Sequence, residues 1–274
     1  MRSLSEMWTT TDRWQVPTGW QQGRGAWGGL VSGQVLTAAM SRLPSADLQP
    51  RSVHIAMLGP VLAGEVTVAV RELRAGRATF SQEVTLTSAA GDLLTHATVI
   101  SGKARAETQV SARIADLPPV PPRGDDRPTP IGPPLAPDFT GRLEFTPVVG
   151  WPFSGAADLV ATGWISLGED AVDELSPAII AAMADGWWIA ALVGVDVPTA
   201  DSAPVPMSTL DFMLQFPAAP PPTPPSELWR TGLWHEGRIV GGRDGYLIEE
   251  RVLRAPTGEV LAWNTQLVAV GRTA

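Results

Sequence analysis

Cysteine is absent from the 274 residues, and lysine and tyrosine occur once each. Without thiols the chain forms no disulfide and has no thiolate metal site or cysteine nucleophile. This composition, with no signal-peptide pattern at the first residues, leads us to expect a cytoplasmic protein. The net charge is −8 and Lys103 is the only lysine, so no broad basic surface is available. We therefore expect neither nucleic acid nor a membrane as a partner.

Histidine is also scarce, with only His54, His96 and His235 in the chain. None lies at a metal-ligand spacing from another His, Asp or Glu on a predicted helix, so we expect no metal and no cofactor. The Gly-x-Ser-x-Gly motif of serine hydrolases is missing as well. His54 lies in a strand-like segment, where a structural histidine is the simplest interpretation.

Asp185 is the one carboxylate in an otherwise uncharged, mostly apolar run from Ser176 to Val195. Ser176 can cap a helix that starts at Pro177, and the run predicts a helix that is apolar all round and therefore buried. An ionised carboxylate is costly to bury, so a lone acid there indicates chemistry. Asp185 and Gly186 break the run too early for a membrane span. The alternative is a shorter helix that ends at Asp185-Gly186, with the acid solvated in a turn.

Prolines divide the chain. Ten of them lie between Pro118 and Pro147, in a stretch that cannot be helix or central sheet. We therefore predict an N-terminal half at 1–103, a proline-rich linker at 104–147 and a C-terminal half at 148–274.

The two halves repeat one order of elements, which indicates an internal duplication. In the first half an uncharged helical segment at 25–41 precedes strands at 53–55, 65–70, 78–84 and 93–100. In the second half the helix with Asp185 precedes strands at 209–216, 228–234, 246–253 and 260–270. Each helix is too apolar to face water, so we expect an α+β fold in which each antiparallel sheet curls around its helix.

With these segments identified, the chain resembles the double hot-dog acyl-CoA thioesterases of the acyl-CoA thioesterase II type. The resemblance covers nearly the whole chain and is carried by the segments GGLVSGQVLTAAM, MADGWW, STLDFMLQF and GEVLAWNTQLVAV. It implies a tandem hot-dog fold and hydrolysis of an acyl-CoA, or a related acyl thioester, without a covalent intermediate. Such enzymes activate water with an Asp, a Thr or Ser, and a Gln. The acid and the amide fall on Asp185 and Gln266.

The hydroxyl residue has no direct match. The segment 228–237 offers Trp234, His235 or Glu236 near the expected place, and Thr231 a few residues early. We predict His235 as the candidate that replaces the hydroxyl. An exposed position beside Glu236 is the alternative for this histidine.

The chemistry assigns a role to each remaining candidate. Burial beside Trp187 and Trp188, which we expect to contact substrate, should raise the pKa of Asp185 and make it a better base toward water. Gln266 would fix the direction of attack. Free amides at the start of the helix at Gly28-Gly29 would stabilise the oxyanion. The alternatives are an outward-facing Gln266 on a terminal strand and a mere tight turn at Gly28-Gly29.

Two other functions compete with hydrolysis. A non-catalytic acyl-thioester binder would keep the fold and lack the hydroxyl. A hydratase would need a His one short turn after Asp185, where this chain has Trp188 and Ile189, so we rank it last. Open sheet edges lead us to expect a homodimer or a higher homo-oligomer.

Overall fold

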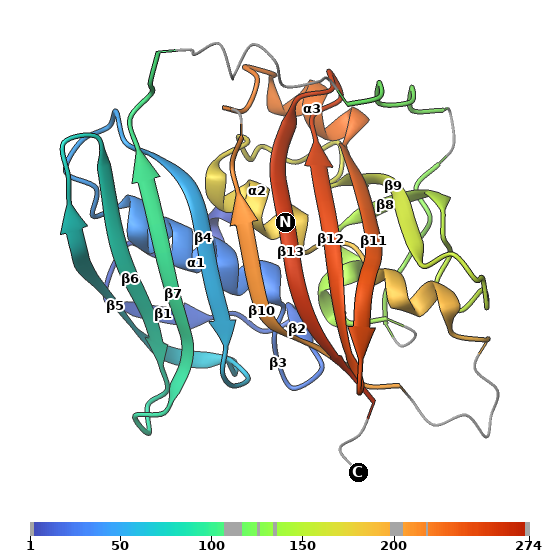
Figure 1. Cartoon of the computed structure of the whole chain (residues 1–274), viewed down its shortest axis with the longest axis horizontal. Helices are drawn as coiled ribbons and strands as arrows, with labels where there is room; N and C mark the ends of the chain where they lie inside the picture. The colour runs from blue at the N-terminus through green and yellow to red at the C-terminus, as the bar shows by residue number, and fades with distance from the viewer. Residues whose placement is uncertain are drawn as a thin grey trace.

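The computed structural model describes residues 3–106, 117–124, 127–133, 136–197, 205–217 and 219–271. Its main feature is one antiparallel sheet of eleven strands in the order β1-β5-β6-β7-β4-β10-β13-β12-β11-β9-β8. Two helices, α1 (Gly28–Met40) and α2 (Pro177–Ala184), pack against each other on one side of this sheet (Figure 1). The architecture is therefore α+β, as the sequence predicts.

The N-terminal half supplies the first five strands of that order. Its elements besides α1 are η1 (Leu4–Met7), β1 (Arg13–Val16), the small pair β2 (Gln21–Gln22) and β3 (Gly25–Ala26), β4 (Gln49–Met57), β5 (Gly64–Ala75), β6 (Thr79–Thr87) and β7 (Leu93–Gly102). The four predicted strands of this half correspond to β4, β5, β6 and β7. Strand β1 alternates with period two, but its four residues are too few to be recognised as a strand from the sequence.

The C-terminal half supplies the other six strands. Its elements besides α2 are η3 (Asp138–Arg142), β8 (Glu144–Val149), β9 (Val160–Ser166), η4 (Ala190–Gly194), β10 (Met207–Gln215), α3 (Pro225–Thr231), β11 (Leu233–Arg243), β12 (Tyr246–Arg254) and β13 (Val260–Val270). From the centre outward, β10-β13-β12-β11 repeats β4-β7-β6-β5, which is the topology that the predicted duplication requires.

The two halves share a single sheet, whereas the sequence suggested two separate ones. Strands β4 and β10 pair antiparallel at the seam, with Ile55 opposite Phe212 and His54 opposite Met213. Ile55 and Phe212 are fully buried, so the seam continues the core from one half into the other. The seam places residues of both halves within reach of one site.

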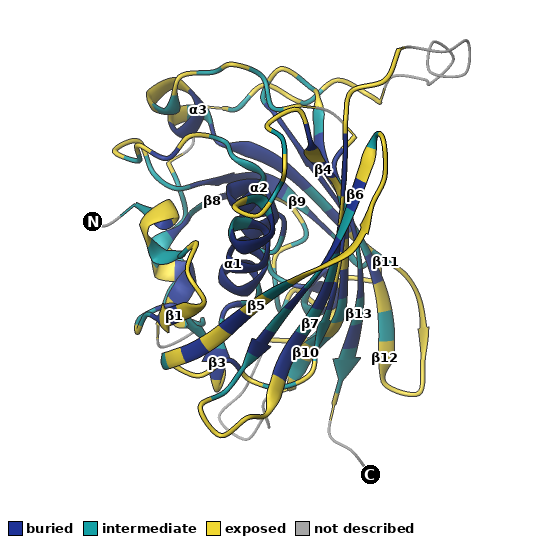
Figure 2. Cartoon of the chain, turned by 90° about the vertical axis from the view of Figure 1, so that its left-hand side faces the viewer, coloured by how far each residue is buried: buried dark blue, intermediate teal, exposed yellow. Residues whose placement is uncertain are grey.

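Both helices are buried, as their lack of charge predicts (Figure 2). Every residue of α2 from Ala178 to Ala184 is buried. The helices approach closely because small residues face each other: a Cβ placed at Gly29 would lie 2.6 Å from the carbonyl oxygen of Ala182. Each Leu, Ile, Val or Met side chain buried here contributes roughly 1.5–3 kcal/mol to folding.

Two predicted elements differ from the structure. The helix that starts at Pro177 stops at Ala184 and does not run on toward Val195, because Asp185 and Gly186 leave helical geometry and a separate 3-10 turn, η4, follows. The predicted strand at 228–234 is mostly α3, because Pro225 fits the first turn of a helix. Gly232, with a φ of 85°, then turns the chain into β11.

The described part of the predicted linker lies against the C-terminal half. The carbonyl of Pro118 accepts a hydrogen bond from Arg254, and Arg123 donates to the carbonyls of Arg230 and Thr231. Strand β8 begins at Glu144, before the predicted boundary at residue 148, and pairs with β9. Residues 107–116 of the linker lie outside the described chain.

Candidate active site

Asp185 lies directly after the last residue of α2 and faces the first turn of α1. Ser176 caps the start of α2 by accepting a hydrogen bond from the Ile179 amide, and the Asp185 amide closes its end on the carbonyl of Ala182. The carbonyl of Asp185 accepts a hydrogen bond of 2.9 Å from Trp27 Nε1. This bond joins the two halves at the acid itself.

The carboxylate of Asp185 reaches the N-terminus of α1. A Cβ placed at Gly28 would lie 2.6 Å from Asp185 Oδ2, so only glycine leaves room for the acid at this contact. The amides of Gly28 and Gly29 precede the first intrahelical bond, which runs from Leu30 to the carbonyl of Trp27. They have no acceptor within α1 and lie next to the carboxylate, and a hydrogen bond from the Gly29 amide lowers the pKa of Asp185. Stabilisation of an oxyanion by these amides stays a prediction.

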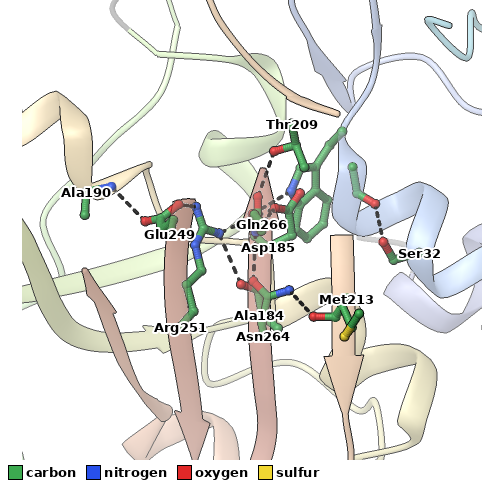
Figure 3. A network of polar contacts seen from close by, with 12 residues as sticks. Ser32, Ala184, Asp185, Ala190, Thr209, Met213, Glu249, Arg251, Asn264 and Gln266 are labelled. Atoms are coloured by element: carbon green, nitrogen blue, oxygen red, sulfur yellow. Dashed lines mark hydrogen bonds and ion pairs between the residues drawn. The ribbon is translucent and has the colours of Figure 1, made fainter. Parts of the chain in front are cut away.

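Gln266 contacts the other oxygen of the acid, as Figure 3 shows. Its Nε2 donates to Asp185 Oδ1 at 3.2 Å and to Asn264 Oδ1 at 2.9 Å, while its Oε1 accepts from Thr209 Oγ1 at 2.7 Å. Because a carboxylate only accepts, the amide nitrogen must face Asp185, and the hydroxyl of Thr209 must donate to the amide oxygen. Gln266 is buried on β13, which excludes the alternative of an outward-facing residue.

Thr209 on β10 provides a hydroxyl in contact with Gln266. The sequence had led us to expect this group within 228–237, a segment that begins in α3 and continues into β11. The position became recognisable only once β10 and β13 were known to pair, with Phe212 opposite Gln266 and a bulge between Thr209 and Asp211. No signal in the sequence specified that pairing.

Two buried charges complete the site and were also missed. Arg251 Nη1 lies 3.4 Å from Asp185 Oδ1 and donates to the carbonyl of Ala184 at 3.2 Å. Its Nη2 donates to Glu249 Oε2 at 2.9 Å, and Glu249 Oε1 accepts from the Ala190 amide at 2.8 Å. Glu249 and Arg251 share the inward alternation of β12 with Leu253. A period-two reading of this strand could have marked them as inward-facing charges.

Burial controls the protonation of the acid. It raises the pKa of Asp185 from 3.8 to about 6, and the negative charge of Glu249 acts in the same direction. The positive charge of Arg251 and the hydrogen bonds from Gln266 and the Gly29 amide lower the pKa and so oppose this effect. The side chain keeps 10% of its area exposed, which leaves access for water. Near neutral pH the group is largely ionised and has the proton affinity of a useful general base.

His235 is not part of this hydrogen-bonded network. The ring is fully buried and stacks on Trp187 with centroids 5.2 Å apart, and neither ring nitrogen has a hydrogen-bond partner within the described residues. Burial, with the positive charge of Arg251, lowers its pKa well below the ordinary value. The ring is therefore neutral and packed. The hydroxyl that contacts Gln266 is that of Thr209, and this packing gives no support to the prediction that His235 replaces the hydroxyl.

The two tryptophans after the acid pack within the C-terminal half. Trp187 is buried and meets Phe145 edge-on at 5.5 Å, and Trp188 Nε1 donates to the carbonyl of Gly150 at 3.1 Å. They fix the chain that leaves Asp185. Their predicted contact with substrate stays a prediction.

His54 lies on the outer face of the sheet. Its neighbours Val53 and Ile55 are fully buried, while its own Nε2 contacts Asp211 Oδ2 at 2.5 Å. The structural interpretation given to this histidine fits the position, although its partner is a side chain.

No group of three His, Cys, Asp or Glu side chains that could hold a metal ion occurs among the residues that the structure describes. In the same residues, no helix combines the length and the apolar character needed to cross a membrane.

Comparisons with known proteins agree with this arrangement. The family models for the N-terminal and C-terminal domains of acyl-CoA thioesterase match residues 16–102 and 114–270. No protein with a curated description matches the sequence.

Solved structures resemble the whole chain. A conserved hot-dog protein of unknown function from Alicyclobacillus acidocaldarius is 24% identical, with a TM-score of 0.78 over 96% of this chain and 93% of its own. A putative thioesterase II from Thermobifida fusca YX is 20% identical, with a TM-score of 0.75 over 96% and 93%. An acyl-CoA thioesterase II from Mycobacterium marinum is 18% identical, with a TM-score of 0.66 over 90% of each chain. These similarities confirm the predicted double hot-dog fold.

Proposed function

This chain belongs to the acyl-CoA thioesterase family and is a thioester hydrolase, and we propose that it hydrolyses acyl-CoA with a water molecule activated by Asp185. The observation that supports this most directly is the contact of one buried carboxylate with Gln266 on one oxygen and with the start of α1 on the other.

The two oxygens of Asp185 have different surroundings. Oδ1 already accepts from Gln266 and Arg251. Oδ2 lies against Gly28, beside the first amides of α1. We place the attacking water on Oδ2, because that oxygen faces the donors that would hold the thioester carbonyl. Gln266 and Thr209 then act by fixing the carboxylate rather than by binding the water directly.

The reaction needs one base and one set of donors. Ionised Asp185 accepts a proton from water as the oxygen forms its bond to the thioester carbon. The carbonyl oxygen becomes an oxyanion, which the amides of Gly28 and Gly29 stabilise at the positive end of α1. The carbon–sulfur bond then breaks, and Asp185 returns the proton to the leaving thiolate. The products are a free acid and a thiol, and no covalent intermediate forms.

The alternative of a non-catalytic acyl-thioester-binding protein rested on a missing hydroxyl. The hydrogen bond from Thr209 to Gln266 supports the hydrolytic proposal instead, because it brings a hydroxyl into contact with that amide.

The test is hydrolysis of a panel of acyl-CoAs of different chain length, followed by release of free thiol. We expect turnover by the native protein and a loss of about 100-fold or more in kcat for Asp185→Asn, which keeps the shape and removes the base. Asp47→Asn is the matched control, because that carboxylate is 77% exposed, lies in the turn between α1 and β4, and pairs with Lys103. Native-level turnover by Asp185→Asn would overturn the mechanism.

A further inference from the structure

The proposed reaction uses the base but leaves the two buried charges beside it unexplained. Glu249 is fully buried and Arg251 is 2% exposed, and both project from β12 into the core. Burying an ion pair costs more than it returns unless the geometry is very good. A chain under selection for stability alone has no need of this pair.

The geometry connects the pair to the base. One nitrogen of Arg251, Nη1, contacts both Asp185 Oδ1 and the carbonyl of Ala184, the last residue of α2 (Figure 3). The other terminal nitrogen, Nη2, contacts Glu249. Glu249 is itself held by the amide of Ala190 at the start of η4. The Arg251–Glu249 pair thus connects the end of α2, which presents Asp185, to η4, which follows Asp185 in the chain.

We propose that Arg251 is a positioning residue that orients Oδ1 of Asp185 and holds this carboxylate in its ionised form, and that Glu249 limits how strongly it does so. The catalytic role of Arg251 rests on the proposed function. The titration of Asp185, which tests the inference, does not. By favouring the ionised form, Arg251 lets Asp185 act as a base at lower pH. Glu249 opposes this effect and so preserves the affinity of Asp185 for a proton.

Few other charges could produce the same effect. The titratable groups that act on Asp185 are Arg251 and Glu249 from β12. His235 of β11 is affected by the same Arg251, and burial keeps that histidine neutral. Neither α1 nor β13 carries a titratable side chain, and Asp211 of β10 contacts His54 on the outer face. The opposite signs of the two β12 charges allow a test in which two substitutions shift one pKa in opposite directions.

The experiment titrates Asp185 directly in the full chain. The carboxyl carbons of aspartate are labelled with ¹³C, and the signal of Asp185 is assigned by its loss in Asp185→Asn. We expect Arg251→Gln to raise the titration midpoint of Asp185 by about 1 to 3 pH units, the effect of removing an opposite charge at this distance. Glu249→Gln should lower the midpoint, and Arg251→Lys should keep it near the native value because the cation remains.

The matched control is Glu250→Gln. Glu250 lies between the two residues in the chain but points outward, where it contacts Arg238 at 2.8 Å. Its substitution should leave the midpoint unchanged. A midpoint that stays constant in folded Arg251→Gln, or that moves in the same direction in Arg251→Gln and Glu249→Gln, would overturn the proposal. If Arg251→Gln does not fold, a midpoint in Glu249→Gln that fails to fall overturns it equally.

Activity then separates this inference from the proposed function. The acidic limb of the pH profile of kcat/KM should follow the Asp185 midpoint in each variant, with KM nearly unchanged. Shifts in the titration without any thioester hydrolysis would remove the proposed function and leave the electrostatic role of Arg251 intact. Normal hydrolysis with an unshifted midpoint would remove the role of Arg251 alone.

Discussion

At the scale of single residues, the site depends on one acid, Asp185, which is costly to bury. Each of its neighbours has a separate role. The amide nitrogen of Gln266 donates to Asp185 and Asn264, and its amide oxygen accepts from Thr209. Gln266 therefore holds Asp185 and Thr209 in place. Such a fully committed amide is a rigid support. The consequence is that changes at Thr209 and Asp185 should affect activity and stability differently.

Removal of the Thr209 hydroxyl should impair catalysis more than folding. Thr209→Val keeps the shape of the side chain but leaves the amide oxygen of Gln266 without its donor, and we expect kcat to fall by about 10- to 100-fold. Thr209→Ser should retain most of the activity. Steady-state kinetics measure both, and Thr265→Val on the outer face of β13 is the control. Equal rates for the valine and serine variants would contradict the role.

The raised pKa of Asp185 should reduce stability near neutral pH. The folded-state pKa of about 6 lies above the ordinary 3.8, so the folded chain binds this proton more tightly than the unfolded chain does. Stability from this group is therefore complete below pH 3.8 and falls as the pH rises to about 6, by about 3 kcal/mol in all. We expect Asp185→Asn to unfold at a higher temperature than the native protein at pH 7.5, with the gain much smaller at pH 4. Thermal unfolding at the two pH values measures this, and a variant less stable than native at pH 7.5 would contradict it.

At the scale of elements, the site lies where the end of one helix meets the start of the other. Helix α2 stops at Ala184, and this stop turns the carboxylate of Asp185 toward Gly28. The close approach of α1 and α2 requires small residues such as Gly29 and Ala182. The helix pair therefore determines the distance between the base and the proposed oxyanion donors.

A methyl group at the start of α1 should disturb the site while the helix remains intact. In Gly28→Ala the new Cβ would lie 2.6 Å from Asp185 Oδ2, so the carboxylate must move away from the amides. We expect a loss of about 10-fold or more in kcat/KM, since small displacements of catalytic groups cost this much. Gly241→Ala, where nothing lies within 4 Å of the added carbon, is the control. Native kinetics in Gly28→Ala would argue against oxyanion binding at this end of α1.

At the scale of the whole molecule, the continuous sheet makes the site a shared product of both halves. Gly28 comes from the N-terminal half, whereas Asp185, Thr209 and Gln266 come from the C-terminal half. The duplication does not duplicate the chemistry, because α1 contains no acid that could play the part of Asp185. One chain therefore carries one such site.

The sheet also changes which surface we expect a homo-oligomer to use. Its two edges are protected from pairing, since β1 has only four residues and β8 contains Pro147. The outer face of the sheet exposes large apolar side chains: Met213, Ile248 and Trp263 are each between 37% and 42% exposed. We expect self-association through this face, so that light scattering gives a dimer or larger for the native chain and a monomer for Trp263→Arg. A native monomer, or an unaffected oligomer in the variant, would contradict this.

The sequence alone determined the features that depend on local chemistry. The apolar helices, the period-two strands and the duplicated order of elements indicated the fold class, because burial and backbone geometry follow from residue type and spacing. The isolation of Asp185 among apolar residues likewise identified the acid. Tertiary structure decided where α2 ends, that two sheets are one, and that Thr209, Glu249 and Arg251 meet Asp185. These contacts join residues far apart in the chain, and strand register and helix crossing, which the sequence pattern does not specify, bring them together.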